Sequence, residues 1–184
     1  MVGEIRDPET AATAVLAANS GHLVLATLHS PTAPSAVQSM FNLGVFPHFL
    51  AGGLLGVMTQ RLVRTLCPHC RQSFDLSDAP HTFEEVRQFL EPVEGHRMFG
   101  PKGCPECRSL GYTGRTGVFE ILKISPAIRR LILDRPAAPV IRQQAVAEGM
   151  VECRLSAMIK VARGQTSVEE VFRAIPPEYL ALEE

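Results

Sequence analysis

Residues 21–30 are Gly21-His22-Leu23-Val24-Leu25-Ala26-Thr27-Leu28-His29-Ser30, and this stretch decides the fold class. The apolar run over His22–Leu28 lacks polar alternation, which predicts a strand buried on both faces in a parallel sheet. Helices are predicted on both sides of it, over Thr10–Ala18 and Pro34–Asn42. The order helix, buried strand, helix predicts an α/β fold.

Changes in composition divide the chain into three predicted parts. The first part, residues 1–66, contains the α/β elements and ends in a third predicted helix over Pro47–Leu66. The second part, residues 67–122, contains paired cysteines, a predicted helix over Thr82–Leu90 and a strand over Gly117–Leu122. The third part, residues 123–184, is a helical region with four short helices predicted at Pro126–Leu133, Val140–Glu148, Leu155–Arg163 and Val168–Ala174. Before the last helix, Ser167 and Glu170 have the spacing of a capping box.

The composition argues against several classes of function. The formal net charge is −1, which gives no broad attraction to nucleic acid or anionic membranes. With two Tyr and no Trp, the chain lacks an aromatic platform for single-stranded nucleic acid. The most apolar run, Phe49–Thr59, is too short to cross a bilayer, and no signal peptide opens the chain. We therefore expect a cytoplasmic protein with reduced cysteines, no nucleic-acid partner and no direct membrane insertion.

Two identical cysteine pairs form the strongest local signal. They are Cys67-Pro68-His69-Cys70 and Cys104-Pro105-Glu106-Cys107. Two cysteines at this spacing can direct both thiolates to one metal ion, and four thiolates complete the closed tetrahedral shell of a structural zinc. The alternatives are ordinary cysteines or redox pairs. The sequence predicts a structural zinc site made of Cys67, Cys70, Cys104 and Cys107.

Polar side chains lie where the strands of the predicted sheet end. Val2-Gly3 has the composition of a strand end, and Glu4 and Asp7 follow it, while Thr27 and His29 end the apolar run. Active-site groups of α/β proteins lie at such ends. Glu4 and Asp7 are therefore candidates to hold magnesium-bound waters or orient an attacking water, and Thr27 or His29 to sense a phosphate. The alternative is that the acids only favour the dipole of the next helix and that the histidine is structural.

Five motifs in series resemble one family. They are Gly3–Thr10, Gly21–Ser30, Gln60–Arg64, the two cysteine pairs and Gly111–Glu120. Their order is similar to that of type II secretion ATPases and type IV pilus assembly ATPases, and the resemblance extends over nearly the whole chain. It implies the C-terminal part of a RecA-like P-loop ATPase core, with a zinc-binding insertion and a C-terminal helical region. It also implies a homo-hexamer that couples ATP hydrolysis to pilus or pseudopilus assembly, through platform proteins of the inner membrane.

The resemblance implies roles for residues near the start of the chain. Glu4 matches the acidic residue of the family's Walker B segment, with Arg6 and Asp7 beside it as further catalytic candidates. His22 and His29 match the family's His box.

Further implied roles lie around the cysteines. Arg61 and Arg64 match a basic helix end before the first cysteine pair, and with Thr27 they are candidates for contact with bound nucleotide. The four cysteines match the family's zinc motif, which retraction motors typically lack. The resemblance therefore favours an assembly or secretion motor.

The sequence departs from the family pattern in two places. After the His box the family usually has Thr-Asn-Asp-Ala, whereas this chain has Ser30-Pro31-Thr32-Ala33. No G-x-x-x-x-G-K-[ST] occurs, so no P-loop holds the phosphates of ATP. We therefore expect a fragment of a motor, from a truncated gene, a mis-assigned start or a split motor, that is inactive alone and uses ATP and Mg only when whole. The alternative is a zinc-stabilised interaction module without catalysis.

Overall fold

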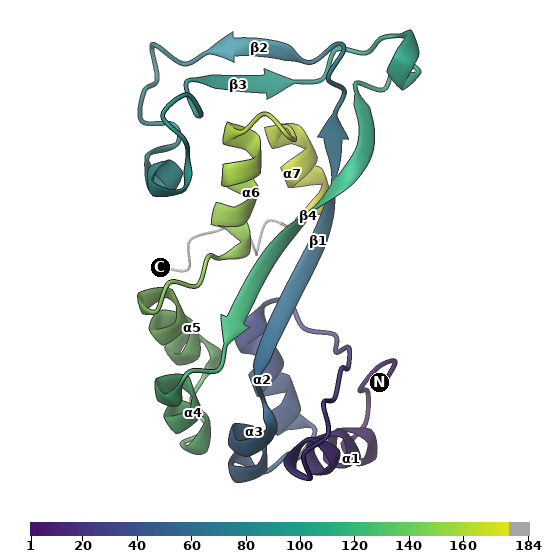
Figure 1. Ribbon diagram of the computed structural model, residues 1–184, viewed down its shortest axis with the longest axis vertical. Helices are drawn as coiled ribbons and strands as arrows, with labels where there is room; N and C mark the ends of the chain where they lie inside the picture. Colours follow the sequence, from purple (N-terminus) through teal and green to yellow (C-terminus); the bar gives the residue numbers. More distant parts are fainter. Residues whose placement is uncertain (177–184) are drawn as a thin grey trace. The chain divides into compact units, whose positions relative to one another are not determined.

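The computed structural model describes residues 1–176, and the chain packs as two compact units (Figure 1). The first unit comprises Met1–Thr59 and Glu120–Val151, and the second comprises Gln60–Phe119 and the segment from Glu152 onward. Each of the three predicted parts, 1–66, 67–122 and 123–184, is thus divided between the two units. Among residues 1–176, no helix has both the length and the apolar character that crossing a bilayer requires.

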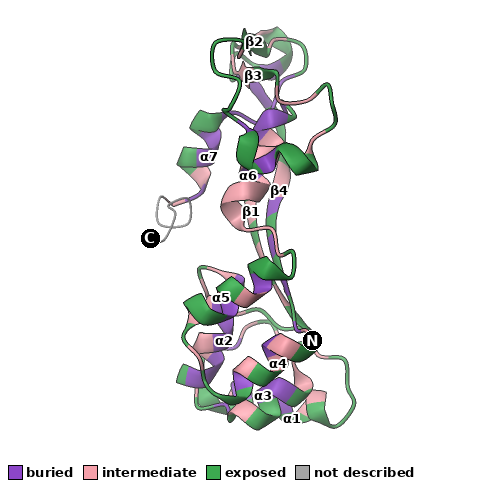
Figure 2. Ribbon diagram, turned by 90° about the vertical axis from the view of Figure 1, so that its left-hand side faces the viewer, coloured by how far each residue is buried: buried purple, intermediate pink, exposed green. Residues whose placement is uncertain are grey.

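Helices dominate the first unit. They are α1 (Pro8–Asn19), α2 (Ala33–Asn42), α3 (Pro47–Gly53), α4 (Pro126–Leu133) and α5 (Ala138–Ala147). Their buried faces form one apolar cluster, which is purple in the lower part of Figure 2. Burial of each large side chain there stabilises the fold by about 1.5–3 kcal/mol. The cluster includes Val37, Phe41, Leu50, Leu122, Ile128, Ile132 and Ile141.

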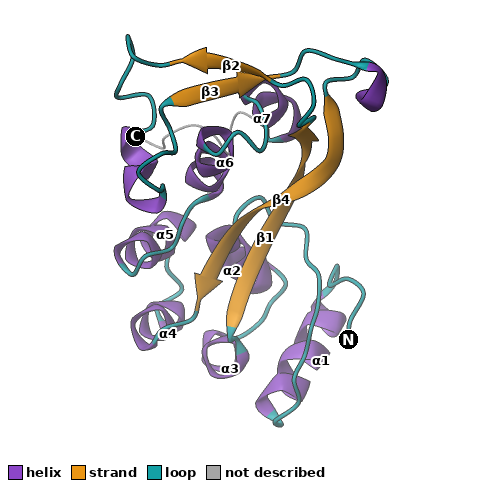
Figure 3. Cartoon of the chain, turned by 45° about the horizontal axis from the view of Figure 1, so that its top comes forward, coloured by secondary structure: helices purple, strands orange, loops and turns teal. Residues whose placement is uncertain are grey.

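The second unit combines short strands and helices (Figure 3). Its short elements are β2 (Gln72–Asp75), the 3-10 helix η1 (Glu84–Phe89), β3 (Arg97–Gly100), the 3-10 helix η2 (Pro105–Cys107), α6 (Cys153–Ala162) and α7 (Val168–Ala174). Strands β2 and β3 pair antiparallel, with Gln72 opposite Gly100 and Asp75 opposite Arg97. The apolar cluster of this unit includes Val63, Val86, Val118, Ala157, Val161 and Ile175.

Two long strands, β1 (Gly56–Leu66) and β4 (Tyr112–Lys123), form a two-stranded sheet. At one end of the pair, the amide of Ile124 donates to the carbonyl oxygen of Leu55 at 3.2 Å. At the other end, the amide of Cys67 donates to the carbonyl oxygen of Gly111 at 2.9 Å. The start of one strand therefore lies beside the end of the other, so the pair is antiparallel (Figure 1).

Helices with a local start signal agree with the sequence-based predictions. α1, α2, α4, α5, α6 and α7 lie within about two residues of the predicted ranges. The Asp7 carboxylate accepts the amide of Thr10 at 2.8 Å, and the Ser125 hydroxyl accepts that of Ile128 at 3.1 Å. These caps satisfy amides that have no partner inside the helix.

The predicted helix over Pro47–Leu66 is wrong in its second half. Helix α3 ends at Gly53, and Gly56–Leu66 is the strand β1. At Gly52 a Cβ atom would lie 2.6 Å from Oδ1 of Asn19, so α3 approaches the end of α1 closely there. The strand is stabilised by pairing with β4, which is distant in sequence, and helical periodicity cannot report such a partner.

The predicted buried strand over His22–Leu28 is also wrong. The amide of Val2 donates to Leu25 O at 2.8 Å and that of Ile5 to Thr27 O at 2.9 Å, but only an isolated parallel bridge between Val2 and Ala26 results. Leu23 is 77% exposed. Val24 and Leu28 pack against the apolar cluster of the first unit. Leu25, like Leu23, is exposed, so within the described residues only one face of the segment is partly covered.

Short-range prediction failed in part in the second unit as well. The predicted helix over Thr82–Leu90 is the 3-10 helix η1, and the predicted strand over Gly117–Leu122 is part of the longer β4. The capping box of α7 is half formed, because Ser167 Oγ accepts the amide of Glu170 at 3.2 Å while the Glu170 carboxylate has other partners.

The carboxylate of Glu170 is fully buried and bound by two arginines. It accepts the amide of Arg64 at 2.9 Å and Nε of Arg64 at 2.8 Å, and both oxygens accept bonds from Arg173 at 2.7 Å. Burial alone raises the pKa of Glu170, but these bonds from Arg173 and Arg64 outweigh it and lower the pKa to about 2. Glu170 therefore attaches α7 to β1 through a charged network.

We predict that Glu170→Gln lowers the free energy of unfolding by about 2 kcal/mol at pH 7, because it removes the charge from buried hydrogen bonds. The folded pKa of about 2 lies below the ordinary value of 4.5, so the ionised carboxylate stabilises the fold above about pH 4.5. That stabilisation disappears as the pH falls from 4.5 towards 2. Denaturant unfolding between pH 7 and pH 2.5 should show the difference between wild type and variant shrinking.

The matched control is Glu169→Gln, which makes the same change at the exposed neighbouring position. It should alter stability by less than about 0.5 kcal/mol. Equal effects of the two variants, or a difference for Glu170→Gln that does not depend on pH, would contradict the buried network.

Candidate functional site

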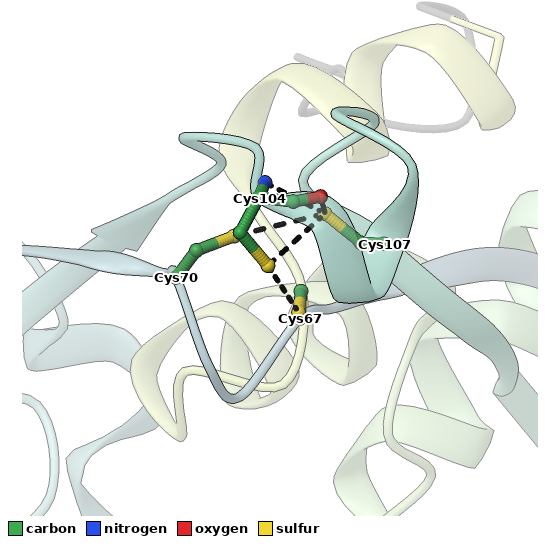
Figure 4. Close-up of side chains that lie close together, drawn as sticks. All are labelled: Cys67, Cys70, Cys104 and Cys107. Carbon is green, nitrogen blue, oxygen red and sulfur yellow. Dashed lines mark hydrogen bonds between the residues drawn. The ribbon is translucent and has the colours of Figure 1, made fainter.

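The two cysteine pairs come together at one end of the β1–β4 sheet. Cys67 directly follows β1, Cys104 directly precedes η2, and Cys107 is the last residue of η2, which precedes β4. Each pair forms a tight turn, with the amide of Cys70 donating to Cys67 O at 3.3 Å and that of Cys107 to Cys104 O at 3.2 Å. Figure 4 shows the four side chains converging from these two turns.

The sulfur positions fit a single tetrahedral metal ion. All four Sγ atoms lie within 4.8 Å of one another. Three separations are 3.9 Å for Cys67–Cys104, 3.8 Å for Cys70–Cys107 and 3.7 Å for Cys104–Cys107. A tetrahedral ion with metal–sulfur bonds of about 2.3 Å has edges of about 3.8 Å, whereas a disulfide is about 2.05 Å. All five cysteines are free, so the four clustered thiols can hold a metal ion.

Backbone amides surround the sulfurs. Cys107 Sγ accepts the amides of Cys104 at 3.2 Å and Gly111 at 3.1 Å, and Cys70 Sγ accepts that of Gly103 at 3.3 Å. Burial raises the pKa of Cys107, but the amides and neighbouring thiols outweigh it and lower the pKa to about 6. Burial is the main cause that raises the pKa of Cys70 to about 11. Cys107 therefore ionises more readily than Cys70.

Gly111 has a conformation that other residues adopt poorly. Its φ is +77°, and a Cβ atom there would lie 2.5 Å from Cβ of Pro101. Its amide donates to Cys107 Sγ, and its carbonyl accepts the amide of Cys67. One glycine therefore connects both cysteine pairs.

Glu4, Arg6 and His29 form a second cluster, in the first unit. Glu4 Oε2 lies 2.5 Å from Arg6 Nη2, and Glu4 Oε1 lies 3.0 Å from His29 Nε2. The hydrogen bond from Arg6 is the main cause that holds the pKa of Glu4 below its ordinary value. Oε1 is shielded from solvent and has no hydrogen-bond partner among the described residues, although His29 Nε2 lies within ion-pair distance of it. A water or cation is the usual partner of such an oxygen.

The other predicted residues of the first unit lie around α1. Asp7 caps α1, and its bonds from Thr10 lower its pKa. The Thr27 hydroxyl donates to Gly3 O and so joins the segments that carry His29 and Glu4. His22 lies at the other end of α1, where its Nδ1 is 3.2 Å from Ala17 O. It lines an open pocket of about 480 Å³ with residues of α1 and Val24.

Arg61 and Arg64 lie on β1, so the predicted helix end before the cysteines is wrong. Arg61 Nη1 donates to Gln60 O at 3.4 Å. The guanidinium of Arg64 binds Glu170 and lies 4.1 Å above the ring of Tyr112. Contact of either arginine with nucleotide stays a prediction.

Two buried acids were missed by the sequence analysis. They are Glu170 and Glu120, which are 1% and 4% exposed. The signal for Glu120 was its position two residues from Val118 and Leu122, because alternation along a strand places all three on one face. No comparable signal existed for Glu170, whose partner Arg64 is distant in sequence.

Comparisons with known proteins identify the family of this chain. The family model described as type II/IV secretion system protein matches residues 1–173. The type IV pilus assembly ATPase TfpB of Acinetobacter baylyi is 40% identical over 96% of this chain and 30% of its own length. The type II secretion system protein HxcR of Pseudomonas aeruginosa is 43% identical over 94% of this chain and 32% of its own length. The chain therefore spans about a third of the length of these relatives.

Solved structures agree on the fold. The ATPase DotB of Legionella pneumophila has a TM-score of 0.59 at 18% identity, over 92% of this chain and 36% of that one. DotB of Yersinia pseudotuberculosis has a TM-score of 0.60 at 20% identity, over 93% and 35%. The predicted fold, that of part of a RecA-like secretion ATPase, is confirmed. The chain belongs to the type II/IV secretion system protein family, as the resemblance of its motifs implied.

Proposed function

We propose that this chain is a portion of a hexameric motor ATPase that couples ATP hydrolysis to pilus or pseudopilus assembly. The names of the relatives support the general role, since they are type IV pilus assembly and type II secretion proteins. The observation that carries the proposal is the shielded, unpartnered Oε1 of Glu4 beside His29. Platform proteins at the cytoplasmic face of the inner membrane are the proposed partners.

Glu4 is the proposed catalytic residue. Its carboxylate is ionised at neutral pH, and Oε1 has no hydrogen-bond partner among the described residues, so this oxygen can orient a water and accept its proton. His29 Nε2 can donate towards the same water or a phosphate oxygen. Mg²⁺ and ATP would supply the phosphoryl group and the charge neutralisation that its transfer requires. Arg6 and Asp7 stabilise the conformation of the segment 4–7 that contains Glu4. Arg6 does so by its ion pair with Glu4, and Asp7 does so by capping α1.

Different observations bear on the other residues that are predicted to act at the nucleotide site, which are Thr27, His22, Arg64 and Arg61. Thr27 acts through the backbone by binding Gly3, which orients the segment before Glu4. His22 is available to a ligand in the open pocket beside α1. Arg64 would have to leave Glu170 to reach a nucleotide, so its role depends on release of the buried network. Arg61 remains the other candidate on β1.

The ion proposed for the four cysteines is zinc. Four thiolates at tetrahedral spacing leave no open position, so the ion would be structural and would join the end of β1 to the start of β4. A second function, a zinc-stabilised interaction module without catalysis, is favoured by one observation. The cysteine cluster is complete in this chain, whereas the sequence has no P-loop.

Metal analysis tests the zinc site. Protein purified under reducing conditions without chelator should contain one zinc per chain, and Cys104→Ser should lose most of it. The second unit should then unfold more easily by several kcal/mol, because binding of a structural zinc contributes directly to folding.

Cys153→Ser is the matched control, since Cys153 lies at the start of α6, outside the cluster. It should keep the zinc. A zinc content near zero in wild type, or equal loss in both variants, would rule out the site.

An ATPase assay tests the motor. The chain alone should show no turnover above background, because nothing in it fixes the triphosphate. Mixing with a polypeptide that carries the P-loop part of a relative should restore turnover. Glu4→Gln should then reduce kcat by about 10²–10⁴-fold, the usual contribution of a general base.

Glu169→Gln is the control for this assay, since it makes the same change at an exposed position of α7. It should keep turnover within about twofold, as expected for a surface change away from the reaction. Turnover by the chain alone that Glu4→Gln abolishes would refute the need for a P-loop part. Restored turnover that Glu4→Gln leaves intact would refute the role of Glu4.

A further inference from the structure

A buried carboxyl on β4 supports the start of α2. Glu120 is 4% exposed, on the same face of β4 as the fully buried Leu122. A carboxyl group in such surroundings is costly unless it is hydrogen-bonded. Its Oε1 accepts the amide of Ala33 at 2.7 Å, and Ala33 is fully buried.

The amide of Ala33 depends on this partner. Ala33 is the first residue of α2, and a first-turn amide has no acceptor inside its own helix. The Thr32 cap accepts the amide of Ser35 at 3.2 Å rather than that of Ala33. Glu120 is therefore the acceptor that fixes the first peptide group of α2.

The segment between Ala33 and His29 is short and stiff. It consists of Ser30, Pro31 and Thr32. Proline fixes one backbone angle, and the Ser30 hydroxyl donates to Thr32 O at 3.2 Å. A displacement of Ala33 is therefore transmitted to His29, whose Nε2 lies 3.0 Å from Glu4 Oε1.

We propose that Glu120 is a positioning residue. By holding the start of α2 in place, it sets the distance between His29 Nε2 and Glu4 Oε1. This inference rests on the proposed function in one respect, because that function makes Glu4 and His29 the residues that act on the bound water. Glu120 itself touches neither of the reacting groups, and it acts through the peptide group of Ala33.

Nuclear magnetic resonance of the whole chain with its metal tests this without nucleotide. In Glu120→Ala the amide of Ala33 should exchange with solvent at least about tenfold faster, because it has lost a charged acceptor. The second readout is the change that Glu4→Gln causes in the ring resonances of His29. That change should be present in the wild-type background and lost in the Glu120→Ala background.

Ser125→Ala is the matched control, because it removes a helix N-terminal acceptor in the same unit, at α4. It should leave the response of His29 to Glu4→Gln intact. Glu120→Gln keeps an oxygen acceptor and should restore the response. If Glu120→Ala does not fold, Glu120→Asp decides, since it keeps the charge but withdraws the carboxyl by one methylene.

A response of His29 that survives in Glu120→Ala, or in Glu120→Asp where the alanine variant does not fold, would overturn the proposal. Equal loss in Ser125→Ala would also overturn it, because general destabilisation would then be the cause. These readouts do not use ATP hydrolysis. Absence of turnover in the mixing assay would therefore count against the proposed function and leave the positioning role standing.

Discussion

The antiparallel pairing of β1 with β4 is the interaction on which the rest of the structure depends. At one end, the bond between Cys67 and Gly111 brings together the two turns that carry the cysteine pairs. At the other end, the pairing directs Glu120 and Leu122 into the first unit, where they meet the start of α2 and the apolar cluster. Both the thiol cluster and the hydrogen bond between Ala33 and Glu120 therefore depend on this pairing.

Three carboxylates show how burial separates structural from chemical roles. Glu170 and Glu120 are buried, and each accepts a backbone amide, from Arg64 and Ala33 respectively. Buried acids with such partners hold elements in place. Glu4 differs, since one oxygen is shielded but unpartnered within the described residues while Arg6 holds the other. An ionised oxygen with unused capacity is suited to bind a water or cation, which is why the catalytic proposal rests on Glu4.

Features that depend on neighbours in sequence could be predicted, and features that depend on distant partners could not. The cysteine spacing and the helices predicted at Thr10–Ala18 and Pro126–Leu133 depend on local sequence, and they agree with the structure. The strand β1 was mistaken for helix because its partner β4 is remote. The His22–Leu28 segment was expected to be covered on both faces, which no described neighbour provides. For the same reason the buried partners of Glu120 and Arg64 could not be read from the sequence.

We propose that Glu4 and His29 face the metal–nucleotide complex of a motor ATPase. Paramagnetic broadening tests it most directly, with Mn²⁺–ATP added to the isotope-labelled chain and an unlabelled P-loop part of a relative. We expect the resonances of Glu4 and His29 to broaden most and those of α6 and α7 to stay unchanged. Excess Mg²⁺–ATP should reverse the broadening. Broadening that is absent from Glu4 and His29, or that excess Mg²⁺–ATP does not reverse, would contradict it.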